Sequence, residues 1–156
     1  FFEPAKSKQI KIKTVLSRSL DQLIGNPDYV LRILDNLISN AIKYSPKNSS
    51  VIVSSKQVNS KIRISIRDQG PGIDPNEQDK LFKKFSKLSN KPTGGESSTG
   101  LGLYIVKKIC TTLNGSVRCE SEPGCGSTFI VELPSVNTRI VSGRRPEVKN
   151  RRRALG

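Results

Sequence analysis

One strip of a predicted helix carries polar residues at the spacing i, i+4, i+7 and i+8, namely Asn36, Asn40, Lys43 and Tyr44. At about 100° per residue these side chains share one edge of the helix, beside its apolar stripe. A helix buried against a sheet has no structural need for two amides and a lysine in one row, and asparagine competes for backbone hydrogen bonds in mid-helix. Taken alone, the strip is interpreted as a solvated polar face, and the glycine motifs that follow shift the interpretation to one wall of a ligand site.

A glycine pair directly follows a predicted strand, in the segment Asp68-Gln69-Gly70-Pro71-Gly72. Glycine has no Cβ, so Gly70 and Gly72 let the backbone approach a flat ligand closely. Asp68 stands at the end of the strand, where its carboxylate can accept a hydrogen bond from an exocyclic amine. A plain turn is the alternative for this segment taken alone.

A second glycine cluster runs from Gly94-Gly95 to Thr99-Gly100-Leu101-Gly102-Leu103 and opens a predicted helix. Helix amino termini behind glycine-rich loops bind phosphates through free N–H groups and the helix dipole. The cluster is no P-loop, because it lacks the spacing GxxxxGK[ST]. It is also no dinucleotide fingerprint, because no short strand and turn lead into it.

Two long helices are predicted to position these groups. The first starts at Asn26-Pro27, an N-cap asparagine followed by proline, and runs to about Tyr44. The second runs from about Gly100 to Leu113, with Thr99 as its cap and Asn114-Gly115 as its stop. Their apolar stripes follow the helical period. The stripe residues are Val30, Ile33, Leu34, Leu37, Ile38, Ala41 and Ile42 in the first helix, and Val106, Ile109, Cys110 and Leu113 in the second.

The remaining periodic segments are strands. Alternation of apolar and polar residues predicts a half-buried strand at Gln9–Thr14 and further strands at Val51–Gln57, Lys61–Arg67, Ser116–Ser121 and Ser127–Leu133. A short helix is expected around Glu77–Phe85, a flexible loop at Leu88–Thr99, and the end of ordered structure at Pro134. The order predicts an α/β fold, with strands in one layer and helices in the other.

Composition excludes several classes of site. The chain of 156 residues has no histidine, which rules out a histidine base, metal ligand or phosphoacceptor within it. Its cysteines, Cys110, Cys119 and Cys125, fit no zinc spacing and are expected to be reduced thiols. No apolar run approaches the roughly 20 residues of a membrane span.

Charge is distributed unevenly along the chain. The segment Ser135–Gly156 has seven basic residues and one acid, and so carries +6 of the net +14. The +8 left for the rest suits a domain that binds a polyanionic ligand. The basic segment itself is interpreted as a disordered or vector-derived tail, with nucleic-acid or anionic-membrane binding as the lesser alternative.

In this order and spacing, the motifs resemble the family that contains histidine kinases, type II topoisomerases, mismatch-repair ATPases and the large heat-shock chaperone ATPases. The histidine-kinase branch is the most similar, and the resemblance covers Phe1 to Pro134. Its boxes are matched by Asn36–Tyr44 (asparagine box), Asp68–Gly72 (first glycine box), Leu81–Phe85 (phenylalanine box), Gly100–Leu103 (second glycine box) and Gly124–Phe129 (closing glycine motif). The implied fold is a two-layer Bergerat-type sandwich, in which a mixed, mostly antiparallel sheet packs on helices.

The resemblance implies that the ligand is ATP with Mg²⁺. Asn40 would ligate the metal, Asn36 would support the metal or its water, and Lys43 would pair with phosphate. Asn36 and Lys43 would thus be the catalytic residues. Asp68 would bind the adenine amine, aided through water by Ser127. The other implied nucleotide contacts are Tyr44, Gly70, Gly72, Ile73, Phe82, Lys87, Gly100, Leu101, Gly102 and Leu103.

The same resemblance implies a mobile lid at Pro75–Thr99. Phe82 and Phe85 would be its hinges on the core, and Lys87 would be its basic residue. With little apolar content, Leu88–Thr99 cannot offset the entropy of ordering, about 1–2 kcal/mol per residue for the backbone. The loop is therefore expected to be poorly ordered until Mg-ATP binds.

Asn36 separates the branches of the family. The ATP-hydrolysing branches have glutamate there as a general base, and asparagine cannot take a proton. The site therefore suits transfer of the γ-phosphoryl to an outside nucleophile, a histidine on a separate dimerisation domain, with a response regulator downstream. The domain is expected to be cytoplasmic, with any membrane anchor in the parent protein, and not to autophosphorylate alone. The alternative is a degenerate nucleotide-binding or signalling module without kinase activity.

Overall fold

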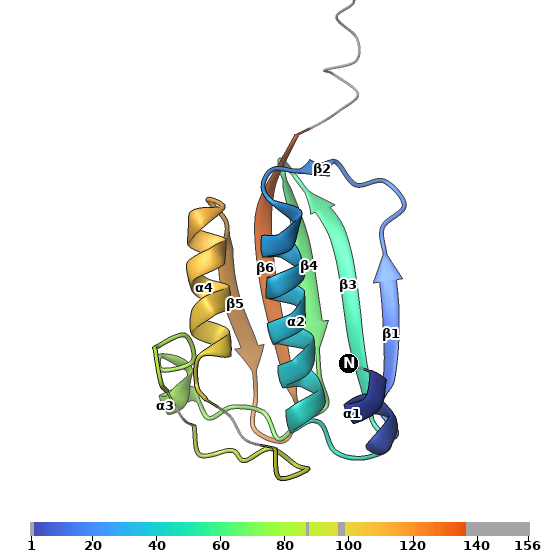
Figure 1. Ribbon diagram of the computed structural model, residues 1–156, viewed down its shortest axis with the longest axis vertical. Coiled ribbons are helices and arrows are strands. Elements are labelled where there is room, and N and C mark those ends of the chain that lie inside the picture. Colours follow the sequence, from blue (N-terminus) through green and yellow to red (C-terminus); the bar gives the residue numbers. More distant parts are fainter. Residues whose placement is uncertain (1, 87, 97–98, 137–156) are drawn as a thin grey trace, which may run out of the picture.

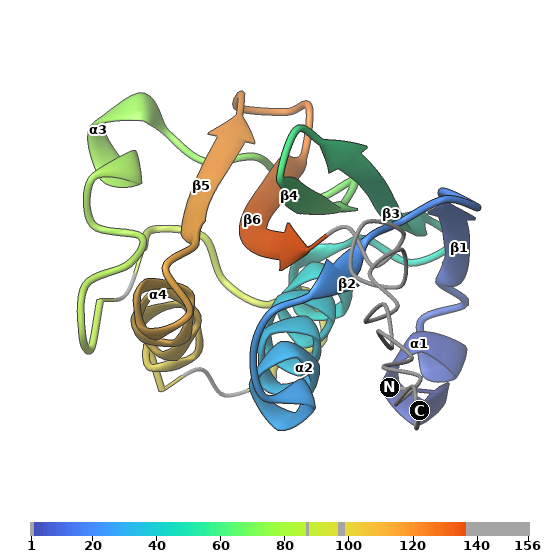
Figure 2. The ribbon, with the colours of Figure 1, turned by 90° about the horizontal axis from the view of Figure 1, so that it is seen from above.

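The computed structural model describes residues 2–86, 88–96 and 99–136. Within them, a sheet of six strands forms one layer and the two long helices pack against it as the other (Figures 1 and 2). The strands are β1 (Lys11–Leu16), β2 (Gln22–Leu23), β3 (Ser50–Val58), β4 (Lys61–Arg67), β5 (Ser116–Ser121) and β6 (Ser127–Val136). The helices are α1 (Phe2–Ser7), α2 (Pro27–Tyr44), α3 (Pro75–Gln78) and α4 (Gly102–Thr112).

The sheet is mixed and mostly antiparallel, as the family resemblance implies. Its strand order is β1-β3-β4-β6-β2, and β5 also pairs with β6. Among the described strands, β1 and β3 run parallel, and the other four neighbouring pairs are antiparallel. Arg67 lies opposite Thr128 in the β4–β6 register. This register places the segment after β4 beside the start of β6, which is where the candidate site forms.

The core lies between the sheet and the two long helices, α2 and α4. The alternating residues Ile62, Ile64 and Ile66 of β4 are buried, which confirms their predicted common face. The predicted helical stripes are confirmed as well, because every member is buried or packs partly buried against the core. Those fully in the core are Ile33, Leu37, Ala41 and Ile42 of α2, and Val106 and Cys110 of α4.

Helix α2 begins and ends where the sequence predicts. The Asn26 side chain accepts a hydrogen bond of 2.9 Å from the backbone N–H of Asp28, and Pro27 occupies the first helical position. The helix stops at Tyr44 because Ser45 leaves the helical conformation ahead of Pro46. Local sequence features therefore fix both ends of the helix that carries the polar strip Asn36–Tyr44.

Helix α4 begins later than predicted, and Thr99 is not its cap. The N-cap position is Leu101, which makes no side-chain capping bond, and the first helical residue is Gly102. Gly100 has a positive φ of 68°, and its carbonyl accepts from the Phe85 N–H at 3.1 Å, so this turn belongs to the preceding loop. The predicted stop at Asn114-Gly115 is confirmed: Asn114 has φ 54° and the Gly115 N–H donates to the Cys110 carbonyl.

Three boundary predictions are wrong. The first strand starts at Lys11 and lies at the edge of the sheet, and all six of its residues are exposed. The helix expected at Glu77–Phe85 is the single turn Pro75–Gln78, which Asp74 caps. Ordered structure continues past Pro134, since β6 runs to Val136 and pairs there with β2.

Helix α1 and strand β2 were not predicted, because both are too short to show a period. The predicted basic tail begins inside β6, and its residues 137–156 lie outside the described residues. Within the described ranges, no helix combines the length and the apolar character that crossing a membrane requires.

Candidate functional site

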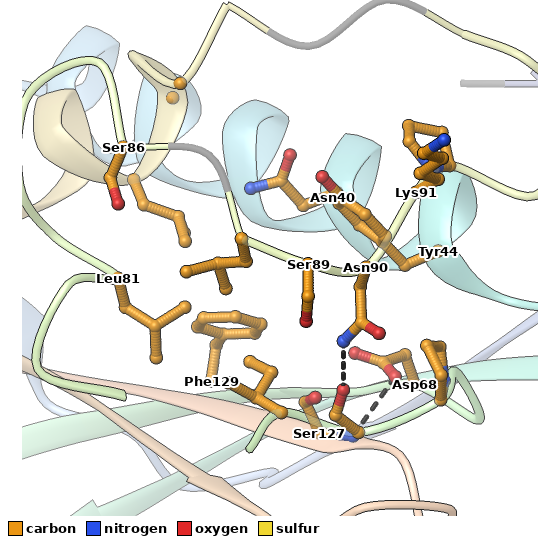
Figure 3. Close-up of a pocket in the computed structure, with 18 residues that line it drawn as sticks. Asn40, Tyr44, Asp68, Leu81, Ser86, Ser89, Asn90, Lys91, Ser127 and Phe129 are labelled. Atoms are coloured by element: carbon orange, nitrogen blue, oxygen red, sulfur yellow. Dashed lines mark hydrogen bonds between the residues drawn. The ribbon is translucent and has the colours of Figure 1, made fainter. Parts of the chain in front are cut away.

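A cavity of about 330 Å³ opens where α2, the segment after β4, the start of β6 and the start of α4 meet (Figure 3). It unites residues from all three sequence clusters, which are far apart in the chain. The predicted site residues that line it are Asn40, Tyr44, Asp68, Gly72, Ile73, Gly100, Gly102, Leu103 and Ser127. The other lining residues were not predicted as contacts one by one, although all except Pro71 and Phe129 fall in the predicted lid; they are Pro71, Leu81, Ser86, Leu88, Ser89, Asn90, Lys91, Pro92 and Phe129.

Asp68 is the buried acid of the cavity, with only 4% of its surface exposed. Its Oδ1 accepts hydrogen bonds from the backbone N–H groups of Gly70 at 2.8 Å and Ser127 at 3.1 Å. Burial raises the pKa of this carboxyl above its ordinary value, although the two backbone bonds oppose the rise. Oδ1 is thus held by the main chain, and in the described part of the chain no donor is recorded for Oδ2.

The glycines around Asp68 allow the backbone to close tightly around it. A Cβ on Gly72, whose φ is +73°, would overlap the carbonyl oxygen of Glu122. A Cβ on Gly126, with φ +84°, would overlap the carbonyl of Asp68 itself. Gly70 also lies close to the Tyr44 carbonyl, which a Cβ would meet at 2.9 Å, but it does not line the cavity.

The strip of α2 divides between the cavity and its surroundings. Asn40 and Tyr44 line the cavity, as Figure 3 shows. Asn36 donates to the Arg32 carbonyl at 2.7 Å, and its Oδ1 lies beside Gly102, where an added Cβ would meet it at 2.9 Å. Asn36 and Lys43 are absent from the lining, so the structure brings two of the four strip residues together around the cavity.

The amino end of α4 faces the same cavity. Gly102 and Leu103 line it, whereas Leu101 does not. Because no side chain caps this helix, its first N–H groups remain available to a ligand, and the first hydrogen bond of the helix comes from Ile105 to the Leu101 carbonyl. Uncapped amides and the positive end of the helix dipole favour an anion at this place.

The loop after α3, which lies within the predicted lid Pro75–Thr99, forms one wall of the cavity. The Asn90 side chain donates to the Gly72 carbonyl at 2.5 Å, and Ser89 bonds to the Glu77 carboxylate. Lys91 lines the cavity, and it and Asp68 are the only charged residues in the described lining. The loop has no periodic pattern, so nothing in the sequence marks Asn90 or Lys91 as wall residues.

The predicted hinge residues behave differently from each other. Phe82 packs partly buried against the core, outside the cavity lining. The expectation that Phe85 also packs on the core is wrong: it is 63% exposed, and its positive φ of 59° turns it outward, beneath the Lys84 ammonium. Lys87, the predicted basic lid residue, lies outside the described residues.

The donor set fits a metal only together with a ligand that brings further oxygens. In the described ranges, no group of three His, Cys, Asp or Glu side chains could hold an ion. Asn40 supplies one amide oxygen at the cavity wall. Mg²⁺ commonly binds through one or two side chains, several waters and the phosphates of a substrate. Asn40 therefore fits the part of a single protein ligand to an ion that a phosphate group carries.

The three thiols are free, as the composition predicts. Burial raises the pKa of Cys119 to about 12, with a further contribution from the negative charges of Asp68 and Glu120. Burial also raises the pKa of Cys110 to about 11. Neither group is a thiolate at neutral pH, so neither contributes nucleophilic chemistry to the cavity.

Comparison with known proteins agrees with these observations. The family model described as histidine kinase-, DNA gyrase B- and HSP90-like ATPase matches residues 25–137. The sensor-like histidine kinase SenX3 of Mycobacterium tuberculosis is 36% identical over 146 residues, which cover 92% of this chain and 35% of that protein. This chain thus spans about a third of the length of that curated relative.

Solved structures share the fold as well. The mycobacterial sensor histidine kinase MprB matches with a TM-score of 0.75 and 26% identity, over 86% of this chain and 90% of that chain. Full-length ShkA in complex with AMPPNP matches with a TM-score of 0.74 and 28% identity, over 86% of this chain and 27% of that chain. The predicted two-layer fold is confirmed by these neighbours.

Proposed function

The chain belongs to the histidine kinase-, DNA gyrase B- and HSP90-like ATPase family, and from this premise we propose that it is the ATP-binding catalytic domain of a sensor histidine kinase. The observation that carries the proposal is that one cavity has a buried carboxylate at one place and an uncapped helix amino end at another. These two features fit the two chemically different ends of an adenine nucleotide.

Asp68 is the proposed adenine contact. Its Oδ1 is occupied by two backbone donors, which leaves Oδ2 to accept a hydrogen bond from the exocyclic amine. Ile73, Leu81 and Phe129 line the same cavity and give a flat base apolar surface to lie against. The backbone N–H of Ser127 donates a hydrogen bond to Oδ1 of Asp68. This bond supports the proposed place of Ser127 beside the purine.

The first N–H groups of α4 are the proposed phosphate contacts, with Gly102 and Leu103 nearest the cavity. When bound, Mg²⁺ would neutralise phosphate charge, and Asn40 would supply its protein ligand. Asn36 lies one turn before Asn40, with its Oδ1 beside Gly102, and is therefore proposed to orient groups at the phosphate end. Because its side chain is an amide, it cannot act as a general base. Lys43 and Lys91 are the proposed cations for phosphate oxygens.

The acceptor of the phosphoryl group is proposed to be a histidine outside this chain. The chain itself contains no histidine, and the relatives of which it spans about a third are sensor histidine kinases. By this proposal the acceptor lies on a dimerisation domain, a response regulator receives the phosphoryl group, and the domain works in the cytoplasm.

Nucleotide binding is the direct test. We expect calorimetry to detect binding of a non-hydrolysable ATP analogue in the presence of Mg²⁺. The expected Kd of about 10 μM corresponds to a binding free energy of about −7 kcal/mol. The matching GTP analogue is the control: its purine has a carbonyl in place of the amine, which the Asp68 carboxylate would repel, so it should bind at least about tenfold more weakly. Absence of heat and of a thermal shift at millimolar ATP analogue would contradict the proposal.

Phosphoryl transfer separates a kinase from a module that only binds nucleotide. We expect no labelling of the isolated chain by ATP carrying a labelled γ-phosphate, because it has no acceptor histidine. Addition of the dimerisation domain of the parent protein should produce an acid-labile, alkali-stable phosphoprotein. A dimerisation domain whose acceptor histidine is replaced by glutamine is the control. Persistent absence of transfer, with nucleotide binding intact, would favour the degenerate module.

A further inference from the structure

We propose that Lys8 is a positioning residue, which fixes the loop wall of the nucleotide cavity by tying the segment Thr93–Glu96 to the carboxyl end of α2. The proposal concerns a residue outside the cavity and outside every motif of the sequence analysis. Its effect on nucleotide affinity rests on the proposed function, whereas its effect on the loop does not.

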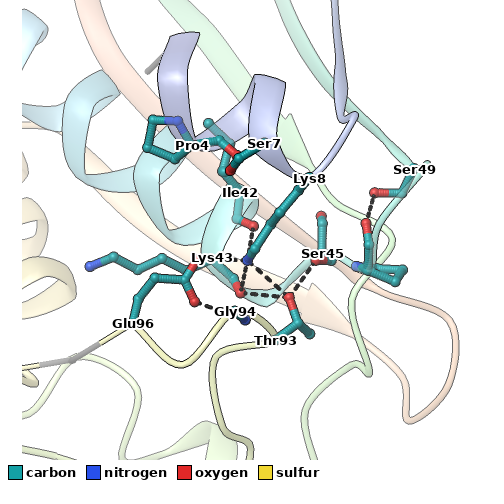
Figure 4. A network of polar contacts seen from close by, with 11 residues as sticks. Pro4, Ser7, Lys8, Ile42, Lys43, Ser45, Ser49, Thr93, Gly94 and Glu96 are labelled. Carbon is teal, nitrogen blue, oxygen red and sulfur yellow. Dashed lines mark hydrogen bonds and ion pairs between the residues drawn. The ribbon is translucent and has the colours of Figure 1, made fainter.

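Lys8 is a buried lysine whose ammonium group is fully engaged. Only 5% of the residue is exposed. Its Nζ donates to the carbonyls of Ile42 at 3.1 Å and Lys43 at 2.9 Å and to the Thr93 hydroxyl at 2.9 Å, and lies 2.7 Å from the Glu96 carboxylate (Figure 4). A buried ammonium without partners is costly, so these contacts act as one unit.

Two of these contacts cap α2. The last carbonyls of a helix have no partner within the helix, and its carboxyl end attracts a positive charge. Lys8 supplies both the donor and the charge to the carbonyls of Ile42 and Lys43. The next residue, Tyr44, lines the cavity. Lys8 thus holds the end of the helix that forms one wall.

The other two contacts of Lys8, with Thr93 and Glu96, hold the loop. Thr93 is bound to the end of α2 as well, because its N–H donates to the Lys43 carbonyl at 3.0 Å and its hydroxyl donates to the Ser45 carbonyl at 2.7 Å. The Glu96 carboxylate accepts from the Gly94 N–H at 2.9 Å as well as from Lys8. Gly94 packs closely against the Lys8–Glu96 pair, since a Cβ on Gly94 would lie only 2.8 Å from the Lys8 Cε.

The tether connects directly to the cavity. Thr93 immediately follows the loop wall Leu88–Pro92, all five residues of which line the cavity. The other side of this wall is held independently, by the Asn90 bond to the Gly72 carbonyl. Lys8 and Asn90 are therefore two anchors, and loss of Lys8 releases the wall at its carboxyl end only.

The tether also refines what is expected of the loop. From its composition, all of Leu88–Thr99 is expected to be poorly ordered without nucleotide. Burial by itself would raise the pKa of Glu96, but the hydrogen bonds from Lys8 and from backbone N–H groups lower it, so the carboxylate stays charged and paired at neutral pH. The middle of the loop is by this argument held before any nucleotide arrives.

The test compares Lys8→Met, which keeps the aliphatic stem, with Lys6→Met, which removes an exposed lysine from helix α1, two residues before Lys8. In the nucleotide-free protein, we expect Lys8→Met to speed amide exchange at Thr93 and Gly94 by about tenfold or more. It should weaken binding of the ATP analogue by about tenfold, the size of one lost charge-assisted hydrogen bond. Lys6→Met should change neither quantity.

Glu96→Gln is the second variant, since it leaves the bonds from Lys8 to α2 in place. It should speed exchange at Gly94 and weaken nucleotide binding by about threefold, even if Lys8→Met does not fold. A fall in melting temperature with unchanged loop exchange and unchanged affinity would show that Lys8 only caps the helix, and would overturn the proposal. If the unaltered chain binds no nucleotide, the proposed function fails, while the exchange data still decide whether the tether exists.

Discussion

Replacement of Asp68 by asparagine is expected to weaken binding of the ATP analogue by about 100-fold or more without loss of stability in the free protein. The amide oxygen of asparagine can still accept the N–H groups of Gly70 and Ser127, which hold Oδ1 in the unaltered chain. The amide nitrogen, however, replaces the Oδ2 acceptor by a donor that faces the donor of the adenine amine. A buried donor without an acceptor costs about 1–3 kcal/mol, and the lost hydrogen bond adds to that cost.

The pH dependence of stability should change with the same substitution. Burial raises the pKa of Asp68 in the folded state above its ordinary value of 3.8. The folded protein therefore holds this proton more tightly than the unfolded chain, and the contribution of Asp68 to the free energy of unfolding falls as the pH rises from 3.8 through the raised pKa. Asparagine does not titrate, so the variant should lose this decline and be at least as stable at pH 7.

Calorimetry and urea unfolding at pH 4 and pH 7 measure both effects. In the unaltered chain, affinity for the analogue should fall as the pH drops below the raised pKa, because the protonated carboxyl loses its acceptor. Asp35→Asn is a suitable control, since it makes the same change at an exposed carboxylate that does not line the cavity. Equal affinity of Asp68→Asn and the unaltered chain would show that the adenine contact is assigned to the wrong residue.

Replacement of Gly72 by alanine is expected to cost about 3 kcal/mol or more in the free energy of unfolding and to abolish nucleotide binding. The positive φ alone costs about 1–2 kcal/mol for a residue with a Cβ. In addition, the new Cβ would overlap the Glu122 carbonyl, which is backbone and cannot rotate away. Relief of that overlap would shift Gly72 and the neighbouring Asp68 relative to the cavity.

Gly124 provides the matched control for this prediction. It has a similar φ of +79°, yet a Cβ there would meet nothing within 4 Å. Gly124→Ala should therefore show the backbone strain alone, about 1–2 kcal/mol, with nucleotide affinity retained. Urea unfolding gives the loss of unfolding free energy in each variant, and the difference between the two losses measures the cost of the overlap at Gly72. Equal losses in the two would mean that the turn between β5 and β6 moves freely away from Gly72.

The parts of the fold that the sequence predicts are those with local causes. The stripe of α2, its asparagine cap and the alternation of Ile62, Ile64 and Ile66 all follow from the spacing of neighbouring residues. The motif around Asp68 could be placed because glycine is needed wherever the backbone comes this close. These elements fix the sheet-and-helix frame and the helix and strand walls of the cavity.

The parts that the sequence did not predict depend on contacts between distant segments. Lys8 and Thr93 are 85 residues apart, and no local pattern distinguishes Lys8 from the other lysines near it. Asn90 and Lys91 belong to a loop whose position is set by such contacts. The alternation at Gln9–Thr14 predicted a half-buried strand, whereas the strand that forms, Lys11–Leu16, is exposed along its whole length. Phe85 is likewise exposed, in a turn whose backbone bonds to the distant Gly100 carbonyl.

The purine end of the cavity has a consequence for the order of folding events. Asp68 and Ser127 are 59 residues apart, and they meet only when β4 and β6 pair in the register that sets Arg67 opposite Thr128. Bringing the two ends of this segment together has a larger entropic cost than forming the short hairpin of β3 and β4. The pairing of β4 with β6 is therefore expected among the later steps of folding. Partly folded chains accordingly offer a nucleotide no purine pocket. Bound nucleotide should hold the finished domain together by slowing its unfolding, and should not act as a template that speeds its folding.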